Sequence, residues 1–163
     1  MAKRHPVPRL VLLTDKRNDA ALERAIARLP RGSALVFRHY HLAPSQRRAR
    51  RAVLRRLCRA RGIVWVDAGE GYGPAEGLRS NGLRLATAHS LREIGRAGGR
   101  ADAVLLSPVF PTRSHPGGKA LGPLRSLLMA RLSSLPVIAL GGMTRARAAH
   151  LPVHGWAAID GLS

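Results

Sequence analysis

The chain repeats one pattern along most of its length: a short run of apolar residues, a polar turn, and then a segment with apolar residues at helical spacing. Clear apolar runs occupy residues 10–13, 34–37, 63–66, 103–106, 136–140 and 155–159. These runs do not alternate with polar residues, which is typical of parallel strands covered on both faces. Strands that alternate with helices predict a parallel sheet, either an open doubly wound sheet or a closed barrel.

The choice between the two architectures depends on the first turn and on the length. No Gly-x-Gly-x-x-Gly pattern follows the first run, so the dinucleotide-binding open sheet loses its best support. The pattern falters over residues 68–74, and a polar-interrupted run at 83–88 gives one further doubtful strand. A complete eight-unit barrel usually takes about 250 residues, and this chain has 163. We therefore predict a single domain over residues 1–163 with an abbreviated TIM-type (β/α) barrel, in which one βα unit after Gly73 and the C-terminal helix are reduced or missing.

The composition excludes several classes of protein. With 45% hydrophobic residues the chain can bury a core, so intrinsic disorder is not expected. The single cysteine, Cys58, excludes a disulfide framework and a cysteine-based zinc site, and it favours a reducing compartment. No apolar stretch approaches the roughly 20 residues needed to cross a bilayer, and the N-terminus lacks the apolar core of a secretion signal. We expect a soluble, cytoplasmic protein with no membrane partner.

The net charge of +19 comes from 28 Lys plus Arg against 9 Asp plus Glu, and nearly all of the basic residues are arginine. Eight of them lie between Arg47 and Arg61, where the apolar residues have helical spacing and aromatic residues are absent. This pattern predicts an amphipathic helix with a solvated basic face. An anionic partner such as nucleic acid, attracted by the charge, is the less favoured alternative.

Residues that could bind a ligand or take part in catalysis follow nearly every predicted strand. The carboxyl ends of parallel strands meet at one face, so these residues should lie close together. They supply cations and hydroxyls for phosphate, carboxylates for Mg²⁺, and histidines for proton transfer. A structural role stays open as the alternative for several of them. Gly141 and Gly142 could simply form a tight turn, Thr14 and Asp15 could start a helix, and His89 could make a structural hydrogen bond. The candidates are Thr14, Asp15, Arg38, His39, His41, Asp67, His89, Thr112, Ser114, His115, Gly141, Gly142 and Asp160.

Three segments of the chain resemble motifs of the thiamine phosphate synthase/TenI family and follow one another in the same order as in that family, whose fold is a (β/α)₈ barrel. Residues 86–90 resemble the family's Gly-x-Ser-x-His-Ser strand end. Residues 106–115 resemble its Gly-Pro-x-Phe-Pro-Thr-x-Thr-Lys loop, and residues 136–143 its Pro-Val-x-Ala-Ile-Gly-Gly-Ile strand. Residues 12–15 and 36–38 fit the first two strands more loosely, so the resemblance spans nearly the whole chain.

The resemblance implies a transferase of thiamine biosynthesis that joins a pyrimidinylmethyl diphosphate to a thiazole phosphate with loss of diphosphate. It implies phosphorylated small molecules as substrates and Mg²⁺ as cofactor. Carried over by motif, Arg38 contacts the diphosphate, Asp67 holds Mg²⁺, and His89 matches the proton-transfer histidine of the tautomerase branch. The loop positions Thr112, Ser114 and His115 meet substrate oxygens, and Gly141, Gly142 and the backbone near Asp160 hold the thiazole phosphate.

Several positions depart from the family's pattern. Tyr40 replaces the lysine of its Arg-x-Lys, Val66 the asparagine of its Asn-Asp, and His115 its loop lysine. Asp160 places a carboxylate where a phosphate is expected. Two alternatives therefore stay open: a TenI-like thiazole tautomerase that uses His89, or a catalytically degenerate module that binds anionic partners. A homodimer is also open, since a barrel without its last helix exposes apolar surface.

Overall fold

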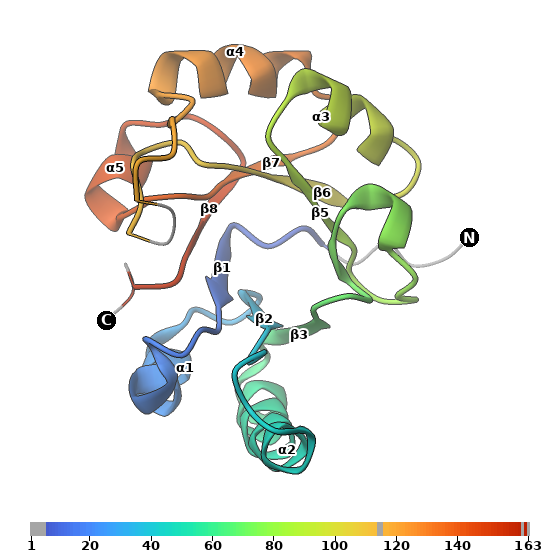
Figure 1. The fold of residues 1–163 in the computed structure, drawn as a ribbon, viewed down its shortest axis with the longest axis vertical. Coiled ribbons are helices and arrows are strands. Elements are labelled where there is room, and N and C mark those ends of the chain that lie inside the picture. Colours follow the sequence, from blue (N-terminus) through green and yellow to red (C-terminus); the bar gives the residue numbers. More distant parts are fainter. Residues whose placement is uncertain (1–5, 114–115, 161, 163) are drawn as a thin grey trace.

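The computed structural model describes residues 6–113, 116–160 and 162, and these form one sheet of eight parallel strands (Figure 1). The strands are β1 Leu10–Leu13, β2 Ala34–Phe37, β3 Val64–Asp67, β4 Tyr72–Gly73, β5 Leu85–Ala88, β6 Ala103–Leu106, β7 Val137–Ala139 and β8 Gly155–Ala158. Their spatial order is β3-β2-β1-β8-β7-β6-β5-β4. An isolated bridge between Ala68 and Tyr72 joins the two edges of this sheet, so the sheet is a nearly closed barrel. The predicted TIM-type fold is confirmed.

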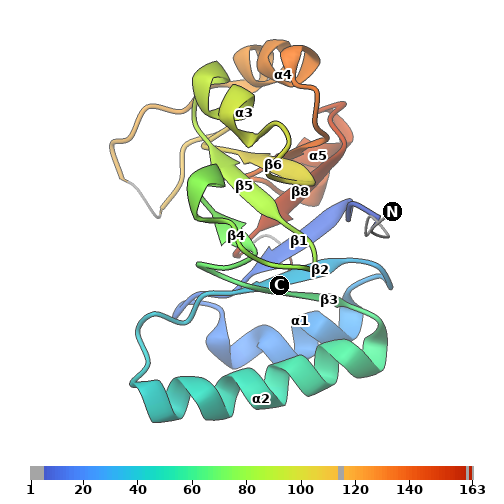
Figure 2. The ribbon, with the colours of Figure 1, turned by 90° about the vertical axis from the view of Figure 1, so that its right-hand side faces the viewer.

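Five helices cover the outside of the barrel in the described part of the chain: α1 Leu22–Arg28, α2 Pro44–Arg61, α3 Leu91–Ala97, α4 Pro123–Leu132 and α5 Arg145–Ala149. Two short 3-10 turns, η1 Asp19–Ala21 and η2 Ala75–Gly77, complete the set. In Figure 2, α1 and α2 lie on the outer side of β2 and β3, and α3 and α4 lie on the opposite side of the molecule. No helix in the described residues is long and apolar enough to span a membrane.

The abbreviation of the barrel lies on both sides of β4, where the sequence pattern falters. Only residues 68–71 connect β3 to β4, with no helix between them, and η2 takes the place of the helix after β4. Gly71 permits this tight connection, because a Cβ there would lie 2.9 Å from both Val66 Cγ1 and the Leu83 carbonyl oxygen. The prediction of a reduced unit after Gly73 is therefore refined: a strand of two residues is present, and the missing helix precedes it. The doubtful run at 83–88 is β5.

Strand side chains alternate between the barrel interior and the layer beneath the helices. On β3, Val64 and Val66 belong to the interior cluster, and Trp65 packs instead with residues under α1 and α2. The same alternation on every strand decides which residues at the carboxyl ends face the mouth of the barrel. The buried interior residues are Val11, Leu13, Ala34, Val36, Val66, Leu83, Leu85, Ala103, Leu105, Ile138 and Ala157.

Candidate functional site

Arg38 continues the inward-facing series of β2 and lies at the mouth of the barrel. Its Nε donates to the Thr14 carbonyl oxygen at 2.9 Å, and its Nη2 lies 3.2 Å from Asp15 Oδ2. Burial raises the pKa of the neighbouring Tyr72 hydroxyl, and the Arg38 guanidinium offsets only part of that rise. Arg38 is thus where a diphosphate contact was predicted, but Asp15 neutralises part of its charge.

His39 is buried behind Arg38 and belongs to a chain of hydrogen bonds that runs from the buried Thr14 to the partly exposed Asp19. Thr14 Oγ1 accepts the Arg38 backbone N–H at 2.9 Å and lies 2.7 Å from His39 Nδ1. His39 Nε2 lies 2.8 Å from Asp19 Oδ1. Because a carboxylate only accepts, Nε2 carries the proton, and Nδ1 accepts the Thr14 hydroxyl. Desolvation lowers the pKa of His39 despite the Asp19 hydrogen bond, so the ring is a neutral, structural group.

Asp67 lies on the outer side of β3, in register with Trp65 rather than with the interior residues. Arg51 of α2 holds both of its carboxylate oxygens, with Nε 2.8 Å from Oδ1 and Nη2 2.5 Å from Oδ2. Burial raises the pKa of Asp67, but the Arg51 hydrogen bonds and charge outweigh burial and lower it. The structure therefore places the predicted Mg²⁺ ligand in a two-pronged ion pair facing α2.

A Mg²⁺ site needs carboxylate oxygens that are free to coordinate. The predicted ligand and the two aspartates that follow β1 and β8 are instead paired with arginine: Asp67 with Arg51, Asp15 with Arg17 and Arg38, and Asp160 with Arg17. One further group of potential ligands, Asp19, His39 and His41, has its atoms within 4.8 Å of one another. Arg50 Nε also donates to Asp19 Oδ1 at 2.8 Å, so a cation already occupies that carboxylate. The described residues therefore do not fit a resident Mg²⁺ ion.

His89 lies at the end of β5 in a fixed orientation. Its Nδ1 is 2.7 Å from the carbonyl oxygen of Ser107, which can only accept, so Nδ1 carries the proton and Nε2 keeps its lone pair. Its backbone N–H donates to Glu93 Oε2 at 2.5 Å, and Ser90 Oγ accepts the Glu93 N–H at 3.3 Å to cap α3. The residue is exposed. The arrangement presents a proton acceptor, Nε2, that is not used within the described fold.

Gly141 and Gly142 form the turn after β7 and pack tightly against the loop that follows β6. Their φ angles are +99° and +60°. A Cβ on Gly141 would lie 2.7 Å from Pro108 Cα, and one on Gly142 2.8 Å from the Pro111 carbonyl oxygen. Phe110 donates its backbone N–H to the Gly141 carbonyl at 3.0 Å, whereas neither glycine N–H has a hydrogen-bond partner among the described residues. The turn offers two bare amides of the kind that accommodate an anion.

Of the remaining predicted residues, Thr112 and Asp160 lie at the same end of the barrel. Thr112 is half-buried on the loop after β6. Asp160 is exposed, with its carboxylate 3.2 Å from Arg17 Nη1. Ser114 and His115 lie outside the described residues.

Sequence reasoning missed two residues of the mouth. Asn18 donates from Nδ2 to the carbonyl oxygens of Leu13 and Ile159, at 2.9 Å each, and so ties β1 to β8. Its polar position in the loop after the first strand was the available signal. Tyr72 was missed because its two-residue strand is too short to show a pattern.

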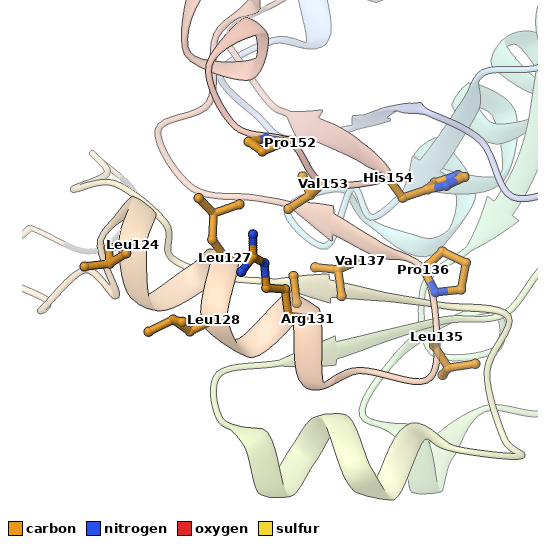
Figure 3. A pocket seen from close by; sticks show the side chains of 11 residues that line it. Leu124, Leu127, Leu128, Arg131, Leu135, Pro136, Val137, Pro152, Val153 and His154 are labelled. Carbon is orange, nitrogen blue, oxygen red and sulfur yellow. The ribbon is translucent and has the colours of Figure 1, made fainter.

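An apolar hollow lies near the opposite end of the barrel and does not belong to this site (Figure 3). It has a volume of about 490 Å³ between α4 and the segment before β8, and it is lined largely by apolar side chains such as Leu127, Val137 and Val153. On α4 itself, Leu124, Leu128 and Leu132 are more than half exposed. The predicted homodimer stays a prediction, and the apolar surface available to it includes this helix.

The comparisons with known proteins agree with the geometry. Residues 82–162 match the family model described as thiamine monophosphate synthase. A thiamine phosphate pyrophosphorylase from Pyrococcus furiosus superimposes with a TM-score of 0.75 at 21% identity, over 93% of this chain and 85% of that one. A thiamine phosphate pyrophosphorylase from Bacteroides thetaiotaomicron gives a TM-score of 0.57 at 13% identity, over 93% and 82%. The search of curated protein sequences gave no significant match. Both structural matches show the same fold, and the family match covers the half of the chain that holds His89 and the two glycines.

Proposed function

The chain belongs to the thiamine phosphate synthase/TenI family, and from this membership we propose that it is an enzyme acting on a thiazole phosphate bound at the carboxyl ends of its strands. The amides of Gly141 and Gly142 hold the phosphate. Their positive φ angles and close contacts with the β6 loop allow only glycine, so this turn, with its two unpaired amides, is one that no other residue forms without strain.

The reaction that the geometry supports best is a TenI-like isomerisation by proton transfer. The observation that carries it is the 2.7 Å contact between His89 Nδ1 and the Ser107 carbonyl, because it leaves Nε2 as an oriented base. Nε2 takes a proton from one carbon of the bound thiazole, the electron pair moves within the ring system, and the resulting imidazolium returns the proton to another carbon. The product has the same atoms as the substrate, and the reaction needs no metal site.

The transferase reaction is the second candidate, and Arg38 is the observation that favours it. A departing diphosphate needs concentrated positive charge, and losing one such contact costs about 10²–10³-fold in rate. Arg38 supplies one cation at the mouth, whereas Asp67 is turned toward α2 and Tyr40, in place of a lysine, supplies none. The residues at the mouth that match the family's pattern therefore favour binding of a thiazole phosphate over release of diphosphate.

The test is isomerisation of a thiazole phosphate followed by NMR in D₂O, with wild-type protein and the His89→Gln variant. We expect kcat to fall about 10²–10⁴-fold in the variant, because a positioned base contributes that much, with little change in the dissociation constant measured by calorimetry. His150→Gln is the matched control, since His150 is exposed and its side chain makes no hydrogen bond within the described structure.

Equal rates in His89→Gln and wild type would contradict the isomerase proposal. If the wild type instead releases diphosphate from a pyrimidinylmethyl diphosphate in a manner that depends on Arg38, the transferase reading replaces it.

A further inference from the structure

The fold divides the eight arginines of α2 into two groups. Four of them make hydrogen bonds to the body of the protein: Arg47 to the Arg38 carbonyl, Arg50 to Asp19 and Glu23, Arg51 to Asp67, and Arg61 to the Ala27 carbonyl. The other four, Arg48, Arg55, Arg56 and Arg59, are exposed and make no hydrogen bond or ion pair within the described residues. We call these four the arginine flank.

The arginine flank borders a hollow that the shortened β3–β4 connection leaves open. On its other side α2 packs against α1, where Arg50 bonds Glu23. On the flank side the described connection from β3 to β4 holds no helix, and a hollow of about 600 Å³ remains. The lining residues are Ala52, Arg55, Arg56, Arg59, Ile63 and Trp65. The part of α2 that a crossover helix would adjoin is therefore bare and cationic.

The spacing of the flank suits a row of phosphates. At 100° per residue, Arg48, Arg55 and Arg59 fall within about 40° of one another around the α2 axis. At 1.5 Å per residue they extend over about 16 Å. One strand of a duplex carries a phosphate per 3.4 Å of axis, so about five phosphates pass along that length.

We propose that the arginine flank binds the phosphate backbone of double-stranded nucleic acid. A second copy of this chain does not suit the surface, because 28 basic residues face only 9 acidic ones and two such molecules repel each other. An acidic amphipathic helix would need exposed apolar side chains in the hollow to pack against. Ile63, which lines the hollow, is only 5% exposed.

Base stacking is also disfavoured on this surface. The Trp65 ring already stacks on Phe37 at 5.3 Å between centroids, and the Arg51 guanidinium lies 5.7 Å from its centroid. Without an open aromatic face the arginine flank offers no stacking platform for unpaired bases, which favours a duplex over a single strand as its partner.

The experiment measures binding of a fluorescein-labelled 20-bp DNA duplex by fluorescence anisotropy between 50 and 300 mM salt. The test variant changes Arg48, Arg55, Arg56 and Arg59 to Gln. The matched control changes Arg24, Arg28, Arg92 and Arg125 to Gln, which are exposed and make no hydrogen bond or ion pair in the described structure. Both variants lose four positive charges. Each lost phosphate contact removes about 0.9 from the slope of log K against log salt. We therefore expect the slope to fall by up to about 3.6 in the flank variant and by less than one in the control.

Equal loss of affinity in the two variants would overturn the proposal, because the net charge would then explain binding. Absence of binding by the wild type at 100 mM salt would overturn it as well. If a poly-glutamate peptide binds the wild type more tightly than the duplex does, and the flank variant loses that binding, the occupant is an acidic protein instead. Thiazole phosphate binding is measured in parallel and stays unchanged in the flank variant, so this proposal and the proposed enzymatic function fail separately.

Discussion

Replacing His39 with Phe tests the buried hydrogen-bond chain that positions Arg38. Phe keeps the ring that stacks on Phe37 at 5.0 Å between centroids, and it removes the bonds to Thr14 and Asp19. The variant therefore separates polar interactions from packing at a site that is 1% exposed.

The cost follows from what each partner retains. The Thr14 hydroxyl still accepts the Arg38 N–H but has no acceptor for its own proton, and a buried unsatisfied donor costs about 1–3 kcal/mol. Asp19 keeps its Arg50 contact, so the loss of the His39 bond costs about 0.5–1.5 kcal/mol. We expect a decrease of about 2–4 kcal/mol in the free energy of unfolding at pH 7.5.

The pH dependence has a definite sign. Desolvation lowers the pKa of His39 in the folded protein below its ordinary value of 6.5. Below pH 6.5 the unfolded chain binds the proton and the folded chain resists it, so the contribution of His39 to stability falls as the pH falls, by at most about 1.4 kcal/mol per pH unit. The Phe variant lacks this group. The difference in unfolding free energy between wild type and His39→Phe should therefore shrink from pH 7.5 to pH 5.5.

Urea unfolding followed by circular dichroism at several pH values measures that difference. A gap that stays constant on acidification would refute the reasoning, because it would mean that folding leaves the pKa of His39 unchanged. A gap that widens would refute it as well, because it would mean that the folded protein holds His39 protonated against Asp19. A stability loss below 1 kcal/mol at pH 7.5 would equally contradict the cost assigned to the Thr14 hydroxyl.

Three further predictions follow from the site and the core. Gly141→Ala should lower the free energy of unfolding by about 2 kcal/mol or more, through positive φ and overlap with Pro108. Gly32→Ala, where φ is +85° but nothing lies within 4 Å of the added Cβ, measures the backbone strain by itself in the same urea titration. Asp67→Asn should cost about 1–3 kcal/mol by breaking the Arg51 pair, and millimolar Mg²⁺ should shift the melting temperature of variant and wild type equally; stabilisation of the wild type only would show that Asp67 binds the ion. Burial raises the pKa of Cys58 to about 12, so Ellman's reagent at pH 8 should react only after unfolding, and rapid labelling of the native protein would contradict the packing beneath α2.

The fold was predictable from the sequence wherever an element was long enough to show a period. The apolar runs marked seven strands, including the doubtful one at 83–88, and the arginine-rich segment marked α2. The two-residue strand β4 was not predictable, because its pairing with β5 and its closeness to Ala68 are tertiary contacts. A strand as short as β4 shows no periodicity in the sequence from which these contacts could be inferred.

The positions of the candidate site residues along the chain were predictable from the sequence, but the directions in which their side chains point were not. Every predicted residue that the structure describes ends a strand or follows one, as the rule for parallel sheets requires. Which way a side chain turns depends on register, and a shift of one residue sends it to the other face. Asp67 illustrates this, because it shares the outward parity of Trp65, and no pattern in the sequence indicates that Arg51 lies opposite it. His89 shares the inward parity of Leu85, and its tautomer depends on a carbonyl from the next strand.

Both the altered mouth and the bare arginine flank lie beside the end of β3. Because only residues 68–71 separate β3 from β4, the turn closes on itself, with the Gly71 N–H donating to the Asp67 carbonyl at 2.9 Å. The outward parity of Asp67 on β3 places its carboxylate beside α2, where Arg51 engages it, and the short connection leaves no helix to cover the adjoining side of α2. A carboxylate withdrawn from the mouth disfavours diphosphate chemistry, and an uncovered row of guanidinium groups favours an anionic partner. The two consequences share no residue, so activity at His89 and binding at the arginine flank can be measured independently.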